Sequence, residues 1–189
     1  PHDATGHGTH VSGTIVGGDA NDAGLHIGTA PEATLMHAKG LGEAGKGNVS
    51  TIIDSMEWAV ANDADIITMS LGAEGLQEDL IDPIQNAQNS DVTVVAAIGN
   101  GGKNTFQSPG AVYNTVSVGS VDIEPAYPEQ VDFRLSDDTV SNFSGGGTIS
   151  RDDWENPPTD WPESYNVPDV TAPGAIIWSA DADLTTETC

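Results

Sequence analysis

The chain has 189 residues, of which 37% are hydrophobic and only 5% aromatic, enough for one modest core built mostly from small and β-branched side chains. Its 29 Asp and Glu against 5 Lys and Arg give a formal net charge of −24, which repels nucleic acid and anionic membranes, so neither is an expected partner. No apolar run is long enough to cross a bilayer, no signal peptide opens the chain, and the single cysteine, Cys189, excludes an internal disulfide.

The first predicted elements are a strand over residues 33–39 and a helix over residues 49–63, with Asn48 or Ser50 as its cap. The apolar face of that helix consists of Ile52, Ile53, Met56, Ala59 and Val60. A buried strand, a helix and two further strands follow, at residues 65–72, 76–90, 92–100 and 114–121. Pro83 either starts or kinks the second helix, because proline cannot donate a backbone hydrogen bond.

This alternation of strands and helices predicts a three-layer α/β fold, a parallel sheet with helices on both faces. In such sheets ligands bind at the carboxyl ends of the strands, here the stretches "MSLG" and "AAIGN". Residues 150–166 interrupt the pattern, because they are rich in Pro, Trp and acidic residues. We expect an acidic, Pro-rich surface insertion there, either a solvated excursion or a salt-dependent or substrate-facing flap.

Two histidines, His7 and His10, stand three residues apart in "GHGTHVSGTIVGG". A zinc site would need a third ligand and often a nearby Glu, so a site made of these two and His2 remains only an alternative. A dinucleotide fingerprint fails because Val11 stands at its third glycine position and no strand precedes it.

A role in proton transfer fits His7 better. Thr9, Ser12 and Gly13 are small, so a helix that starts near His7 can pack deep inside the fold. The positive amino end of that helix disfavours the imidazolium form of His7, which helps to keep a general base neutral.

Several stretches resemble, in order, the blocks of the subtilisin-like serine peptidases: "HGTHVSGTI", "IGTAPEATLMHAKGLGEAGKG", "ADIITMSLG", "VTVVAAIGNGG", "SPGAVYNTVSVGSVD", "SNFSGGG" and "PDVTAPGAIIWSA". The resemblance covers nearly the whole chain except residues 150–166. It implies a subtilisin-like α/β fold and a serine endopeptidase that hydrolyses peptide bonds through an acyl-enzyme. Its expected partner is a protein or peptide substrate, and a pro-segment is a further candidate partner.

The resemblance also assigns roles to single residues. His7 would be the general base, Asn100 would donate its side-chain amide to the developing oxyanion, and His10 would be structural. The substrate would be added as a strand between two binding segments. These are Ser70, Leu71 and Gly72, and Gly45, Lys46 and Gly47.

Ala97, Ile98 and Gly99 would line one wall of the pocket for the substrate residue that precedes the scissile bond. Ile98 is bulkier than the alanine often found there, so the size of this pocket stays open. No cofactor is required. Calcium is possible as a structural ion, because residues 19–24 fall where family members often carry a calcium loop. Its weak candidate ligands are Asp19, Asn21 and Asp22.

Two parts of the family's Asp-His-Ser triad have no match. Asp3 lies too close to His7 to be the triad aspartate, and none of Ser141, Ser144 and Ser179 opens a small-residue helix. We therefore interpret residues 1–189 as a partial catalytic domain, incomplete at both ends, weakly stable and inactive by itself. The alternative is a non-catalytic homologue that acts as a binding or structural module.

The acidic excess has two interpretations. Intrinsic disorder is one, but apolar segments recur throughout the chain and argue against it. Adaptation to high salt, where self-repulsion is screened and surface carboxylates hold water and cations, fits the few lysines and small core residues better. We expect a halophilic peptidase, secreted as the family resemblance implies.

Overall fold

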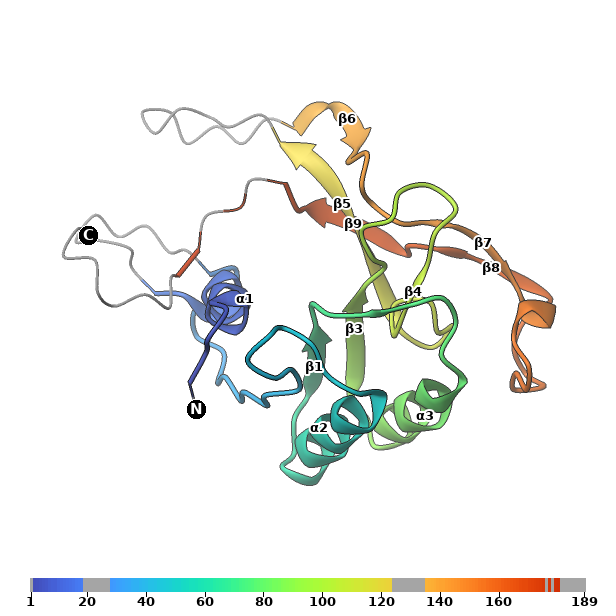
Figure 1. The fold of residues 1–189 in the computed structure, drawn as a ribbon, viewed down its shortest axis with the longest axis horizontal. Helices are drawn as coiled ribbons and strands as arrows, with labels where there is room; N and C mark the ends of the chain where they lie inside the picture. The colour runs from blue at the N-terminus through green and yellow to red at the C-terminus, as the bar shows by residue number, and fades with distance from the viewer. Residues whose placement is uncertain (1, 19–27, 124–134, 176, 178, 181–189) are drawn as a thin grey trace. The chain divides into compact units, whose positions relative to one another are not determined.

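The computed structural model describes residues 2–18, 28–123, 135–175, 177 and 179–180. They belong to two compact units: Pro1–Asn62 together with Trp178–Cys189, and Asp63–Ile177. Figure 1 labels the elements of both units. No helix among the described residues is both long and apolar enough to span a bilayer.

The first unit holds the helices α1 (His7–Val16) and α2 (Val49–Ala61). Helix α2 confirms the prediction for residues 49–63, with Asn48 at its N-cap and Ile52 and Met56 as its buried residues. Their exposed fractions are 8% and 2%, so this part of the predicted apolar face is a core face.

The strand predicted over residues 33–39 is wrong, since this stretch pairs with no described strand. Leu35 and Met36 are 43% and 36% exposed. The segment is instead tied to its own unit through His37, whose Nδ1 lies 3.3 Å from Ser12 Oγ, and Lys39, whose Nζ donates to the His2 carbonyl at 2.7 Å. Apolar side chains make a segment suitable for a sheet. The segment becomes a strand only where a neighbouring strand supplies its backbone hydrogen bonds.

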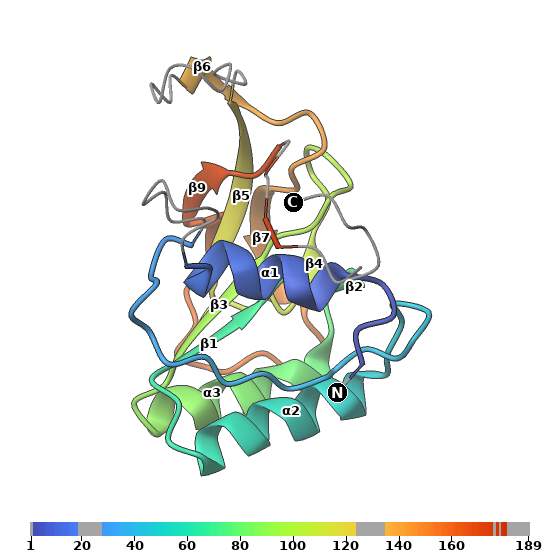
Figure 2. The same cartoon turned by 90° about the vertical axis from the view of Figure 1, so that its left-hand side faces the viewer.

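The second unit is built on a mixed sheet in which β1 (Ile66–Met69), β3 (Thr93–Ala97) and β5 (Val116–Ile123) are parallel neighbours. Strand β9 (Val170–Pro173) also runs parallel to β5, and β6 (Leu135–Val140) runs antiparallel to it. Figure 2 shows these strands from the side. The sheet and the helices confirm the α/β class. The strands predicted over residues 65–72 and 92–100 are present over shorter ranges, and the one predicted over residues 114–121 is shifted by two residues towards the C-terminus.

Burial in the sheet alternates, so β1 is not the fully buried strand that was expected. Ile66 is 62% exposed and Ile67 only 8%, as expected where successive side chains of a strand point to opposite faces of the sheet. The covered face carries Ile67, Met69, Val94, Ala96 and Ile98.

The helix α3 (Ile81–Asn89) follows a short 3-10 turn, η1 (Glu78–Leu80), and contacts β3. Pro83 falls in the first turn of α3, where its missing N–H group has no helical acceptor to lose. Of the two predicted roles, Pro83 therefore lies at the start of the helix and does not kink it.

Residues 150–166 are not a solvated excursion. Strands β7 (Gly147–Ser150) and β8 (Ser164–Val167) pair antiparallel and, with the 3-10 turn η2 (Arg151–Asp153), form an ordered arm over residues 147–167, which we call the β7–β8 arm. Trp154 and Trp161 are each 3% exposed, and their rings lie edge to face at a centroid distance of 5.4 Å. Composition predicted the polar outside of this arm but not its apolar inside.

Polar contacts fix the β7–β8 arm to the rest of its unit. The Trp154 Nε1–H group donates to the Tyr165 hydroxyl at 2.9 Å, and that hydroxyl donates to the Ala111 carbonyl at 2.8 Å. Burial raises the pKa of Tyr165 well above its usual range, so the hydroxyl stays a donor. The Glu78 carboxylate accepts the backbone N–H of Glu155 at 2.6 Å.

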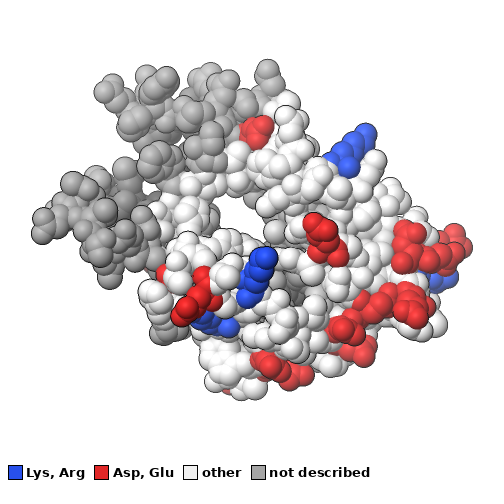
Figure 3. Space-filling model, viewed as in Figure 1, with Lys and Arg blue, Asp and Glu red and all other residues white. Residues whose placement is uncertain are grey.

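The charged groups of the arm face outward. All five of its Asp and Glu side chains are exposed, namely Asp152, Asp153, Glu155, Asp160 and Glu163. Figure 3 shows patches of acidic groups on the drawn face, mainly along its lower and right-hand parts, with a few basic groups between them.

The substitution Tyr165→Phe tests the anchor of the arm. It leaves the buried Trp154 N–H group and the Ala111 carbonyl without their partner, so we expect the free energy of unfolding to fall by about 1–3 kcal/mol. Urea unfolding of the purified protein measures this. The matched control is Tyr113→Phe, because Tyr113 is 44% exposed and packs 5.1 Å from the same ring. It should change stability by less than about 0.5 kcal/mol. Equal effects of the two variants would contradict an anchoring role of the Tyr165 hydroxyl.

Candidate active site

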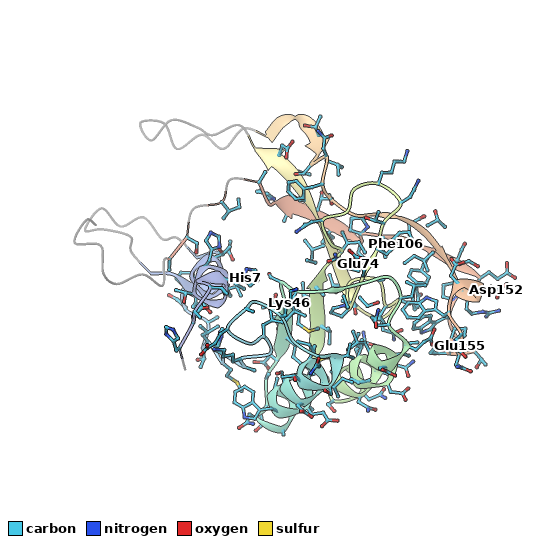
Figure 4. All side chains as sticks on the ribbon, in the orientation of Figure 1. His7, Lys46, Glu74, Phe106, Asp152 and Glu155 are labelled. Atoms are coloured by element: carbon cyan, nitrogen blue, oxygen red, sulfur yellow. The ribbon has the colours of Figure 1, made fainter. Side chains whose placement is uncertain are left out.

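His7 is the first residue of α1, as predicted. The N-cap is Gly6, whose φ of 73° lies in the left-handed region that glycine enters without strain. The His10 N–H group donates to the Gly6 carbonyl at 2.9 Å and begins the helical ladder. The imidazole of His7 is thus carried at the amino end of a helix, on an exposed residue (Figure 4).

Asp3 holds this helix start together. Its carboxylate accepts the Thr9 N–H group at 2.7 Å, the Thr9 hydroxyl at 2.8 Å and the Gly6 N–H group at 3.1 Å. The backbone hydrogen bond from Thr9, followed by that from the Thr9 hydroxyl, lowers the pKa of Asp3 to about 2. Asp3 is thus a cap of α1, a role that was not predicted although an Asp shortly before a helix start is the usual signal for one.

The predicted close packing of α1 is confirmed at Gly13. A Cβ atom at this position would lie 2.5 Å from Ser179 Oγ and 2.7 Å from Ala180 Cβ. Only glycine therefore fits where α1 meets residues 179–180. The Ser179 hydroxyl donates to the His10 carbonyl at 2.7 Å, which gives it a structural role in this contact.

In the second unit, the carboxyl ends of β1 and β3 lie side by side. Met69 pairs with Ala96 in the parallel ladder, so residues 70–72 and 98–100 leave the sheet at the same edge. Just beyond, β2 (Ala73–Glu74) and β4 (Gln107–Ser108) pair antiparallel and connect the two exits. This is the edge at which sequence analysis predicted ligand binding.

The loop that carries Asn100 is fixed from both sides. The Gly99 carbonyl accepts the Gly145 N–H group at 2.8 Å, and the Gly102 N–H group donates to the Phe143 carbonyl at 2.8 Å. Asn100 itself is exposed, and within the described part of the chain its side-chain amide has no hydrogen-bond partner. A rigid loop with an uncommitted amide is what an oxyanion donor needs, since preorganised donors cost no reorganisation.

The side chains of the two serines near this loop, Ser141 and Ser144, form hydrogen bonds within the fold. Ser141 and Ser144 are 2% and 5% exposed. Ser141 Oγ lies 2.8 Å from Ser120 Oγ, and Ser144 Oγ accepts the Ser120 N–H group at 3.0 Å. Both hydroxyls join β5 to the 141–146 loop rather than face a ligand.

The predicted pocket wall changes in detail. Ile98 is 1% exposed, so its bulk lies in the core and not in an open pocket. The side chain that stands against Gly99 is Gln107, a residue that sequence analysis did not single out. Residues 45–47 form an exposed turn in the first unit, with the Lys46 carbonyl accepting the Gly42 N–H group at 2.8 Å.

His7 and residues 45–47 belong to one unit, whereas Asn100 and residues 70–72 belong to the other. Their convergence on a single cleft stays a prediction from the sequence.

No metal site emerges from the described residues. His2, His7 and His10 form no metal-ligating group, and neither do any other described His, Cys, Asp or Glu side chains. The calcium candidates Asp19, Asn21 and Asp22 lie outside the described residues.

Comparison with known proteins gives a match to the Subtilase family, peptidase S8, over residues 1–189. The chain belongs to the subtilase family. It is 33% identical to the serine protease AprX of Bacillus subtilis over 194 residues, covering 95% of the chain and 40% of that protein. It is 40% identical to subtilisin DY of Bacillus licheniformis over 124 residues, covering 64% of the chain and 44% of that protein.

Among solved structures, Sphericase superposes with a TM-score of 0.72 at 29% identity, covering 96% of this chain and 56% of its own. The likeness confirms the subtilisin-like fold class. The chain spans only about half the length of these relatives, or less.

Asp3 gives the subtilase helix α1 a measurable pH dependence. Because its pKa is lowered from 3.8 to about 2 on folding, its stabilising contribution is complete above about pH 5 and is lost as the pH falls towards 2. We expect Asp3→Asn to abolish this pH dependence and to speed hydrogen exchange of the Thr9 amide, both measurable by NMR. Asp54→Asn, on the exposed surface of α2, is the control and should leave the Thr9 amide unchanged. Slow Thr9 exchange in Asp3→Asn would contradict the capping role.

Proposed function

We propose that the protein carrying this chain is a serine endopeptidase that cleaves protein or peptide substrates through an acyl-enzyme. Membership of the subtilase family supports this, together with one observation on the site: the uncommitted amide of Asn100 stands on a fixed loop at the carboxyl edge of the sheet. The serine nucleophile and the orienting aspartate are proposed to lie in segments outside residues 1–189.

In this mechanism His7 takes the proton of the nucleophilic hydroxyl and later gives it to the leaving amine. Its place at the start of α1, capped by Asp3, supports the role, because the helix end fixes the backbone that carries the imidazole. Asn100 donates a hydrogen bond to the oxyanion of the tetrahedral intermediate, where a preorganised donor is most effective.

The substrate is proposed to bind as an added strand along residues 70–72, with residues 45–47 on its other side. Residues 70–72 are suited to this because they continue β1, an end strand of the described sheet, past its last ladder pair. No cofactor takes part in this chemistry, and calcium would have only a structural role.

Two substitutions in the full-length protein test the mechanism. His7→Ala should abolish peptide hydrolysis while leaving the fold intact, because no base then activates the nucleophile. Asn100→Ala should lower kcat by about 10²–10³-fold, the range measured for the oxyanion donor of subtilisin itself. Steady-state kinetics on a chromogenic peptide and circular dichroism provide the readouts. His2→Ala, an exposed histidine near the chain start, is the matched control and should keep full activity.

The same protein should be labelled by a fluorophosphonate, which modifies only an activated serine. One adduct per molecule in the wild type and none in His7→Ala is the expected result. A wild type that neither hydrolyses peptides nor takes up the label would contradict the peptidase proposal and favour a non-catalytic binding module.

We further propose that the protein works in a high-salt environment outside the cell. The net charge of −24 supports this, because repulsion among exposed carboxylates is screened as salt rises. The unfolding midpoint should therefore increase between about 0.1 M and molar KCl, where the Debye length falls from about 10 to 3 Å. Thermal unfolding monitored by fluorescence measures it. A midpoint that stays flat over this range would contradict the adaptation to salt.

A further inference from the structure

The backbone on both sides of Asn100 consists of glycines, namely Gly99, Gly101 and Gly102. Because glycine has the widest backbone freedom, such a segment keeps a side chain in one orientation only where other groups fix it. Its two ends are fixed, since Gly99 and Gly102 are hydrogen-bonded to the 141–146 loop. In the part of the chain that the structure describes, no backbone hydrogen bond engages Asn100 or Gly101. The orientation of Asn100 therefore depends on what holds the backbone directly after it.

The side chain of Thr105 supports this backbone. A Cβ atom at Gly101 would lie 2.6 Å from Thr105 Oγ1, 3.0 Å from Thr105 Cβ and 3.2 Å from Thr105 Cγ2. The Thr105 side chain thus packs directly against Gly101, in space that any larger residue at position 101 would need. The Thr105 hydroxyl also donates to the Gly102 carbonyl at 2.7 Å. One side chain therefore contacts Gly101 and closes the turn at Gly102.

The backbone of Thr105 is itself held by the 141–146 loop. Its carbonyl accepts the Gly146 N–H group at 3.1 Å, and the N–H group of the preceding Asn104 donates to the Gly146 carbonyl at 2.7 Å. Phe106, which follows Thr105, is labelled in Figure 4. Because Thr105 is fixed from outside the loop, its side chain gives residues 100–102 a rigid support.

We propose that Thr105 is a positioning residue for Asn100, which keeps the side-chain amide aimed at the oxyanion. The inference rests on the proposed function, in which this amide donates to the tetrahedral intermediate. Without the hydroxyl, the Gly102 carbonyl loses its side-chain partner and the peptide units after Asn100 gain freedom. A donor that must be reoriented during the reaction stabilises the transition state less than a preorganised one.

The test removes the hydroxyl but keeps the shape of the side chain, with Thr105→Val in the full-length protein. We expect kcat on a chromogenic peptide to fall by about tenfold while KM stays within about twofold, because the oxyanion forms only in the transition state. Thr105→Ser keeps the hydroxyl and should restore most of kcat.

A double-variant cycle separates positioning of Asn100 from a general effect on the fold. In the Asn100→Ala background the donor is gone, so adding Thr105→Val should lower kcat by less than about twofold more. Thr148→Val is the matched control and should keep the wild-type kcat. The exposed Thr148 hydroxyl also donates a hydrogen bond, to Asn166 Oδ1 at 2.8 Å, but within the β7–β8 arm.

Three results would each overturn the inference and leave the proposed function standing. They are an unchanged kcat in Thr105→Val, an equal loss in Thr105→Ser, and the same loss from Thr105→Val in the Asn100→Ala background. If the wild type neither hydrolyses the peptide nor takes up the fluorophosphonate, the proposed function fails and the inference fails with it. Should Thr105→Val not fold, Thr105→Ala and Thr105→Ser in the same two backgrounds decide in its place.

Discussion

The parallel pairing of β1 with β3 is the constraint on which the site in residues 63–177 depends. It brings residues 70–72 and Asn100 to one edge of the sheet, although they lie far apart in the sequence. Beyond the last β1–β3 pair the two segments are no longer paired with each other. A little further along, Ala73 and Glu74 pair instead with Ser108 and Gln107 in the short β2–β4 ladder. Sheet register, and not any single side chain, therefore sets the geometry of this half of the site.

Much of this could be predicted because the deciding signals are local. The β-branched run before Asn100 predicts a buried strand that ends in a turn, and the small residues after His7 predict a closely packed helix. Both are present, as β3 and α1. The family blocks then add the expected roles of His7 and Asn100, which pattern alone leaves open between a core residue, a turn residue and a catalytic one.

The errors have a common physical origin in contacts between distant segments. Residues 33–39 have the composition of a strand but lack a partner among the described strands. Trp154 and Trp161 occur in an acidic, Pro-rich stretch, so composition hides the fact that they bury each other and pack near Tyr113. Gln107 follows an ordinary Gly- and Asn-containing loop, and only the fold places its side chain between two glycines.

The contact between Gly13 and residues 179–180 has a consequence for the order in which the chain can fold. Helix α1 has only 10 residues, and an isolated helix of that length is marginal in water. Its tight partner is synthesised more than a hundred residues later, so the contact closes one of the longest loops in the chain. During translation the segment around His7 must therefore wait, without this support, until residue 180 has left the ribosome.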